Sequence, residues 1–98
     1  MPIARRNFDL GILPDVERWM VRVYDFLAPR AGDAFAHWEL YQVLTGTPDN
    51  VMGGPESNMY EAALAELENR SAITPGLVDG KRYYAFHRSM NTETWEPA

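Results

Sequence analysis

The sequence of 98 residues contains no cysteine, so disulfide bonds and thiolate metal ligands are excluded from its chemistry. A chain without cysteine suits a reducing compartment, and we expect a cytoplasmic protein. It also lacks any apolar run near the ~20 residues that a membrane-spanning helix needs. No apolar segment follows its first arginines, as one would in a signal peptide. These absences predict a chain that neither enters a membrane nor binds a metal through sulfur.

Basic residues are scarce, with nine Lys and Arg against fourteen Asp and Glu, which gives a net charge of −5. Nucleic-acid binding draws heavily on Lys and Arg contacts with phosphates, so this balance favours a protein partner over DNA. An acidic domain can still bind DNA where its cations cluster. The length is that of a single domain.

Residues suited to catalysis are also few. The histidines, His37 and His87, fall on different predicted elements, and the spacing of a two-histidine metal site is absent. None of Ser57, Ser71 and Ser89 lies in the context of a nucleophile elbow, and no carboxylate spacing suggests an acid/base pair. We therefore expect a protein that is not an enzyme and that uses neither a metal nor a cofactor.

Apolar periodicity predicts three helices. The first begins at Asp15 and ends before Pro29, and the second follows an extended link at residues 33–35. The third begins near Glu56 or Ser57, with Ser57 as a candidate cap, and ends near Arg70. The apolar positions expected to face the core are Val16, Trp19, Met20, Val23, Phe26 and Leu27, then Ala36, Leu40, Val43 and Leu44, then Met59, Tyr60, Ala63, Leu64 and Leu67.

A β-hairpin is predicted after the third helix. Residues 72–78 and 81–88 are strand-like, and Asp79-Gly80 between them is a favoured dipeptide of a type I′ turn. The expected organisation is an N-terminal arm (1–14), which pairs as a short strand or lies across the core, a domain (15–88) and a polar C-terminal tail (89–98).

The segment Asn58-Met59-Tyr60-Glu61-Ala62-Ala63-Leu64-Ala65-Glu66-Leu67-Glu68, followed by Ile73 and the hairpin, resembles the third helix and wing of PadR-like regulators. With the element order, it makes residues 15–88 similar to the winged helix-turn-helix superfamily. The fold class that this implies is α+β, mainly α, with three helices followed by a β-hairpin wing. In such proteins the third helix usually enters the DNA major groove and the wing contacts the backbone.

The resemblance implies which residues of this chain would face the DNA groove and which would form the tip of the wing. Relatives commonly carry Arg, Lys, Ser or Thr on this helix face, whereas this chain has Glu61, Glu68 and two alanines. Two glutamates without a lysine between them would repel a duplex. The loop that precedes the helix is also longer than the usual tight turn. The positions concerned are Asn58, Glu61, Ala62, Ala65 and Asn69 on the helix, with Lys81 and Arg82 on the wing.

Two further sets of residues are candidates for binding. Trp38 points away from the apolar stripe of its helix and is either an interface anchor or covered by Phe8, Leu10 or Trp95. The second set is a strip of cations, which forms only if the arm lies beside the wing and is otherwise ordinary surface charge. Its members would be Arg5, Arg6, Lys81, Arg82 and Arg88.

The leading hypothesis is a non-enzymatic interaction module that binds a protein through Trp38, Asn58, Glu61, Ala65, Glu68 and Asn69. A regulator or inhibitor of nucleic-acid machinery fits it, including a phage-type inhibitor that mimics DNA. The alternative is a sequence-specific transcription regulator that reads DNA with its arm and wing. A third hypothesis is a metabolite-sensing or assembly domain that uses the loop at residues 47–55. A homodimer is compatible with each hypothesis.

Overall fold

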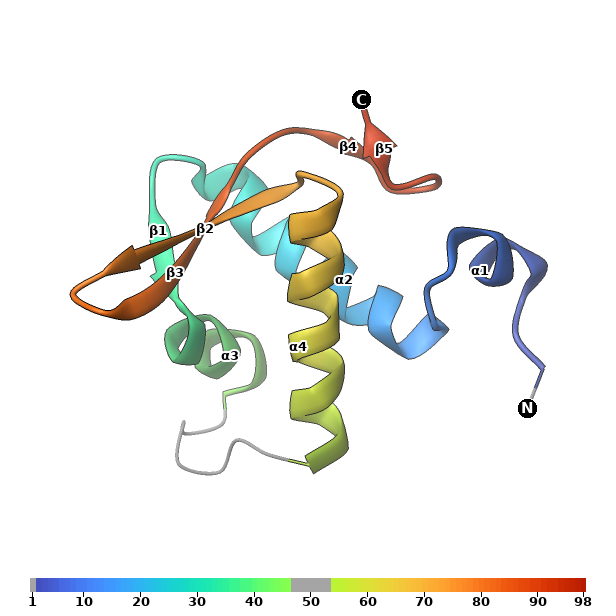
Figure 1. Cartoon of the computed structure of the whole chain (residues 1–98), viewed down its shortest axis with the longest axis horizontal. Coiled ribbons are helices and arrows are strands. Elements are labelled where there is room, and N and C mark those ends of the chain that lie inside the picture. Colours follow the sequence, from blue (N-terminus) through green and yellow to red (C-terminus); the bar gives the residue numbers. More distant parts are fainter. Residues whose placement is uncertain (1, 47–53) are drawn as a thin grey trace.

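The computed structural model describes residues 2–46 and 54–98 and has an α+β architecture (Figure 1). Helices occupy the centre, and a small antiparallel sheet lies at one end of the long axis. The elements are α1 (Arg5–Leu10), α2 (Pro14–Leu27), a 3-10 turn η1 (Ala28–Arg30), β1 (Ala34–Ala36), α3 (His37–Thr45), α4 (Gly54–Asn69), β2 (Ile73–Val78), β3 (Lys81–Phe86), β4 (Met90–Asn91) and β5 (Glu96–Pro97).

Helix α2 confirms the first predicted helix. Pro14 occupies its first turn, where a missing N–H costs nothing, and Asp15 and Glu17 place negative charge near its N-terminus. Its apolar stripe is buried, with Met20 and Val23 at 0% exposure, and packs mainly against α4. Helices α2 and α4 therefore form the centre of the hydrophobic core.

Helix α3 differs from its prediction in one position of the inner stripe. Leu40 is buried as expected, but Val43 is 52% exposed and Tyr41 is buried instead. The ring of Tyr41 stacks on Trp19 at 5.8 Å and lies 5.0 Å from the ring of Tyr60. An aromatic ring buries more apolar area than valine, so burial of Tyr41 turns Val43 toward solvent.

Helix α4 begins earlier than predicted, at Gly54. The proposed cap Ser57 was therefore wrong, because this residue lies inside the helix and is only 7% exposed. The predicted inner face is confirmed by the burial of Tyr60, Leu64 and Leu67. The loop proposed for residues 47–55 lies almost entirely outside the described residues.

The sheet has the order β1-β3-β2, and all its pairs are antiparallel. The predicted turn is confirmed, since Asp79 and Gly80 have φ of 53° and 74°. The turn pairs Val78 with Lys81, which leaves Pro75 at a position whose nitrogen points to the open edge of β2. Proline offers no N–H there, so this edge is poorly suited to pairing with another strand.

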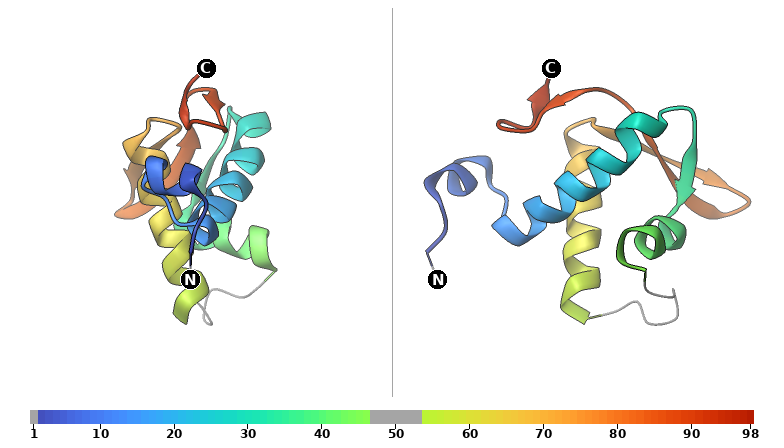
Figure 2. Two further views of the ribbon diagram at one scale, coloured as in Figure 1. Left: turned by 90° about the vertical axis from the view of Figure 1, so that its right-hand side faces the viewer. Right: turned by 180° about the vertical axis from the view of Figure 1, so that it is seen from behind.

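Both terminal segments differ from their predictions. The arm was expected to pair as a short strand or to lie across the core, but residues 5–10 form helix α1, which ends at Gly11 with φ of 73°. The tail was expected to be simply polar, yet Trp95 is 1% exposed and belongs to the core. Figure 2 shows the C-terminal segment running past α2 toward α1. Within the described residues, no helix has the length and apolarity to cross a bilayer.

Candidate functional site

The outward side of α4 is exposed because the opposite side fills the core. We call this side the α4 face. It includes most of the positions predicted to contact a partner, and Glu68 borders it as a half-buried residue. Its exposed residues are Asn58, Glu61, Ala62, Ala65 and Asn69.

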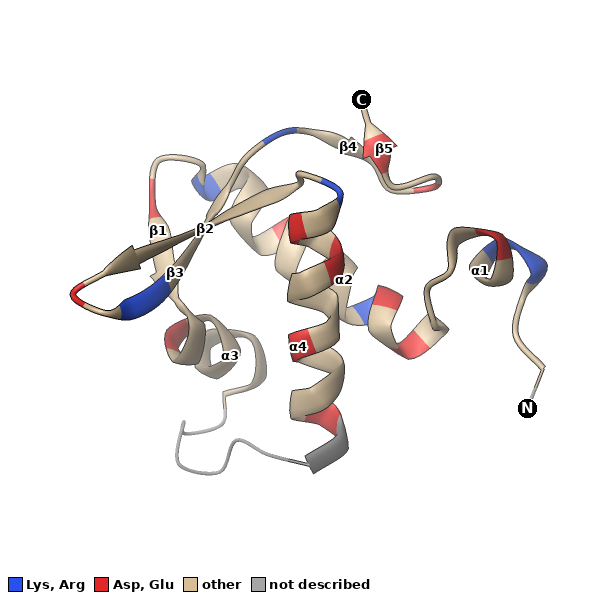
Figure 3. Cartoon of the chain, viewed as in Figure 1, with Lys and Arg blue, Asp and Glu red and all other residues tan. Residues whose placement is uncertain are grey.

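All charged residues of α4 are acidic (Figure 3). The sequence of α4, GPESNMYEAALAELEN, contains four glutamates and neither lysine nor arginine. Arg70, just beyond the helix, is engaged within the fold. Its Nε donates to Glu66, four residues earlier, at 3.2 Å, and its Nη2 donates to the carbonyl of Leu10 at 2.9 Å. The helix therefore presents negative charge without a compensating cation of its own.

Glu61 forms an ion pair with His37 at the start of α3. The buried Tyr60 donates its hydroxyl to the carbonyl of His37 at 2.8 Å, and the two rings lie 5.3 Å apart. Burial raises the pKa of Tyr60, so the phenol remains a donor. Sequence reasoning missed this group because its members come from separate helices and have no local signature.

Arg82 on β3 extends along the sheet toward the core. Its Nη1 donates to the hydroxyl of Tyr84 at 3.3 Å. This hydrogen bond, together with the negative charges of Glu68 and Glu61, raises the pKa of Arg82. Burial raises the pKa of Tyr84 in turn. Arg82, which lines the same hollow as Glu68, is thus bound to Tyr84 within the fold.

A hollow of about 260 Å³ lies between α4 and the hairpin. The pairing of Leu77 with Arg82 places both side chains on the sheet face that bears Tyr84, and Leu77 is 74% exposed. A hydrophobic side chain at this exposure is available for contact with another molecule. The residues that line the hollow are Glu68, Pro75, Gly76, Leu77 and Arg82.

Trp38 is 44% exposed at the first turn of α3. The alternative in which Trp95 covers it was wrong, because Trp95 packs against Tyr24 at 6.1 Å. Phe8, another proposed cover, is itself 68% exposed. Trp38 is therefore an exposed aromatic residue next to His37, whose side chain contacts Glu61 of α4.

The predicted strip of cations does not form as one group. Figure 3 places α1, with its arginines, and the tip of the hairpin at opposite ends of the molecule. Arg5 pairs with Asp9 at 3.0 Å. Lys81 and Arg82 remain together on the β2–β3 hairpin, and Arg88 is exposed beyond β3. The prediction failed because the path of the arm depends on contacts that are distant in the sequence.

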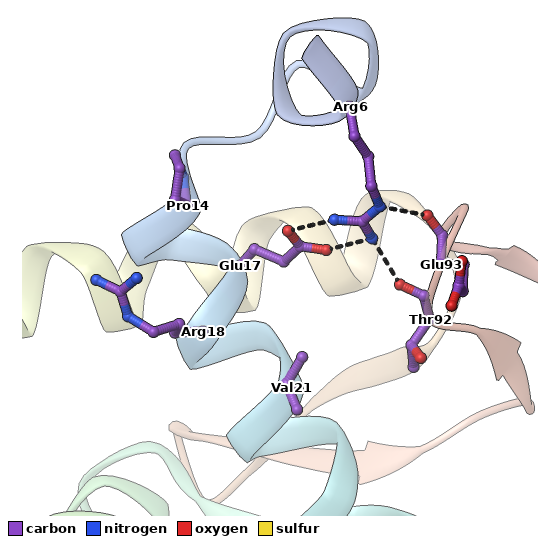
Figure 4. Close-up of a pocket in the computed structure, with 7 residues that line it drawn as sticks. All are labelled: Arg6, Pro14, Glu17, Arg18, Val21, Thr92 and Glu93. Carbon is purple, nitrogen blue, oxygen red and sulfur yellow. Dashed lines mark hydrogen bonds and ion pairs between the residues drawn. The ribbon is translucent and has the colours of Figure 1, made fainter. Parts of the chain in front are cut away.

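Arg6 instead belongs to a group that we call the Glu17 cluster, formed by Arg6, Asn7, Glu17 and Trp95. Figure 4 shows Arg6 between Glu17 and the backbone of Thr92 and Glu93. Arg6 donates to both oxygens of Glu17, at 2.8 and 2.6 Å. Its Nε and Nη2 also donate to the carbonyls of Glu93 and Thr92, both at 2.9 Å. Glu17 further accepts from Asn7 at 2.9 Å and from Trp95 at 2.7 Å.

The Glu17 cluster is structural. The hydrogen bond from Arg6 is the main cause that lowers the pKa of Glu17 to about 2, and Trp95 and Asn7 contribute. A hollow of about 530 Å³ adjoins the cluster, and two arginines line it. Arg6 donates to the tail and to Glu17, and Arg18 pairs with Asp15. The cluster joins α1, α2 and the tail, and it has no signature in the sequence.

Neither metal-binding geometry nor similarity to known proteins assigns a further role to this chain. Among residues 2–46 and 54–98, no group of three or more His, Cys, Asp or Glu side chains is placed to hold a metal ion. In comparisons with protein-family models, curated proteins and solved structures, no significant match to the chain was found.

Proposed function

We propose that the chain is a winged-helix module that binds a protein partner and does not catalyse a reaction. The order of α2, β1, α3, α4, β2 and β3, with β1 paired to the central strand β3, supports the winged-helix assignment. In that assignment α4 is the third helix and the β2–β3 hairpin is the wing.

The observation that carries the proposal is the charge of the α4 face. A helix that enters the major groove brings its outward side within reach of two phosphate backbones, and cations there release counterions. Here the charged residues of α4 are all glutamates. Glu61 contacts His37 of α3, and Glu68 faces Arg82, which donates to Tyr84. A duplex docked on this face would meet repulsion, whereas a basic protein surface would be attracted.

Exposed apolar groups beside the α4 face supply the second requirement of a protein interface. Leu77 at the hollow and Trp38 on α3 are large and accessible, and tryptophan is among the residues that most often anchor interfaces. Carboxylates presented where a DNA-binding protein expects phosphates suit a regulator or inhibitor of nucleic-acid machinery. The target class is therefore a protein with a basic, DNA-binding surface.

Site-specific crosslinking tests the proposal. A photoreactive residue at Ala65, an exposed position in the middle of the α4 face, should form an adduct with a protein in nuclease-treated host extract. The adduct should disappear when Glu61→Lys and Glu68→Lys are introduced together. The same photoreactive residue at the exposed Val21 on α2 is the matched control and should not form this adduct. No protein adduct at Ala65, or an adduct that persists in the double charge reversal, would overturn the proposal.

The second candidate function is a DNA-binding regulator that uses its wing. Lys81 and Arg82 are both exposed at the start of β3, where a wing meets the backbone, and this favours it. Replacing both by glutamate should then abolish DNA binding. Unchanged affinity of Lys81→Glu/Arg82→Glu for a duplex would reject this candidate.

A further inference from the structure

The end of the molecule that carries α1 is unusually apolar for an exposed surface. Ile3 is 42%, Phe8 68% and Leu13 61% exposed, and all three belong to residues 2–13. Figure 1 places this end opposite the tip of the hairpin. Exposed large side chains that gather in one region mark an interaction surface more often than scattered ones do.

The same end contains an apolar groove of about 380 Å³. The start of the chain forms one wall, the first turn of α2 another, and Met59 of α4 contributes to the lining. Asp15 is the charged residue on its rim. The residues that line it are Pro2, Ile3, Leu13, Pro14, Asp15, Val16 and Met59.

This apolar end is held in place. Arg6 and Asn7 of α1 are bound to Glu17, and Ile12, after the helix, is 3% exposed. Phe8 therefore projects from an anchored helix, and association does not have to order it first. Preorganisation of this kind lowers the entropic cost of binding.

The charges at this end are complementary to one another. Arg5 lies over the ring of Phe8 at 5.8 Å, and its side chain is 83% exposed. Asp15 stands at the groove, and its side chain is 51% exposed. Both have local partners, Asp9 and Arg18, but exposed ion pairs of this type are weak and easily exchanged.

We propose that a second copy of this chain occupies the groove, in a two-fold symmetric dimer. Phe8 of each copy inserts into the groove of the other, and Arg5 of each copy approaches Asp15 of the other. A two-fold contact needs one surface that carries both halves of a complementary pair, and this end presents a projecting ring with a cation and an apolar groove with a carboxylate. The α4 face and the wing remain available to a partner.

Sedimentation velocity of the full chain, from about 1 µM to about 1 mM, tests the dimer. The wild type should pass from monomer to dimer in this range. Phe8→Ala should raise the dissociation constant about tenfold or more, because a buried phenylalanine loses its partner surface. Val43→Glu, at an exposed valine of α3, is the matched control and should dimerise like the wild type.

A charge exchange distinguishes this dimer from any other. Arg5→Glu and Asp15→Arg should each weaken association, and the double variant should restore it toward the wild type. Circular dichroism should show all variants folded, since Phe8, Arg5 and Asp15 are exposed. A wild type that stays monomeric at the highest concentration overturns the proposal. A dimer that tolerates Phe8→Ala, or that is not restored by the double variant, overturns it as well.

Discussion

Two glutamates of this chain illustrate how its two ends differ. Glu17 accepts hydrogen bonds from three side chains and has its pKa lowered to about 2. The carboxylate of Glu68 forms no ion pair or hydrogen bond with the other described residues and only faces Arg82 across a hollow. The first carboxylate holds the fold together, whereas the second remains available to another molecule. Partners within the fold, and not charge itself, separate a structural group from a candidate binding group.

Replacing Trp95, beside Glu17, and Trp38, on α3, should produce the largest difference in the free energy of unfolding. Trp95→Ala should lower the free energy of unfolding by about 3–5 kcal/mol, because it leaves a cavity in the core and removes a donor from Glu17. Trp38→Ala, at a 44% exposed position, should cost less than about 1 kcal/mol. Urea denaturation followed by circular dichroism measures both. Equal losses would show that the C-terminal segment is not part of the core.

Removing the carboxylate of Glu17 or of Glu68 should produce the second largest difference in the free energy of unfolding. Glu17→Ala should cost about 3 kcal/mol, since Arg6, Asn7 and Trp95 lose their acceptor together. Glu68→Ala is the matched control and should change stability by no more than about 0.5 kcal/mol. The two variants are compared by the same denaturation measurement. A cost at Glu68 as large as that at Glu17 would contradict the assignment of their roles.

Acid should weaken the Glu17 cluster selectively. The pKa of Glu17 falls from its ordinary 4.5 to about 2 in the folded chain, so its contribution is present above pH 4.5 and is lost as the pH falls toward 2. The full loss corresponds to about 3 kcal/mol. Denaturation at a series of pH values should show this decline in the wild type and a flatter profile in Glu17→Gln. Parallel profiles would place the acid sensitivity elsewhere.

The sequence predicted the elements whose signals are local. Apolar residues at helical spacing identified α2 and the buried side of α4, and Asp79-Gly80 identified the hairpin. These signals arise from neighbours along the chain, so a single sequence contains them. The exposure of the α4 face followed directly, because the outward side of a helix is fixed once its buried side is known.

The sequence could not predict contacts between distant segments. Phe8, Leu10 and Ile12 alternate like a strand, yet α1 is a helix whose position depends on Arg6 and Glu17. The sequence suggested Trp95 only as a cover for Trp38, because its actual partners, Tyr24 and Glu17, lie on the distant helix α2. Such contacts depend on tertiary packing, which overrides local pattern in short elements.

The central claim, that the α4 face binds protein and not DNA, is tested most directly by titrating a labelled duplex at several salt concentrations. The wild type should bind no better than non-specific proteins do, at about 10⁻⁴ M or weaker at physiological salt. Glu61→Lys/Glu68→Lys should bind more tightly and increase the salt slope by about 2, because it adds two phosphate contacts. Submicromolar, steeply salt-dependent binding by the wild type, not improved by this charge reversal, would contradict the account.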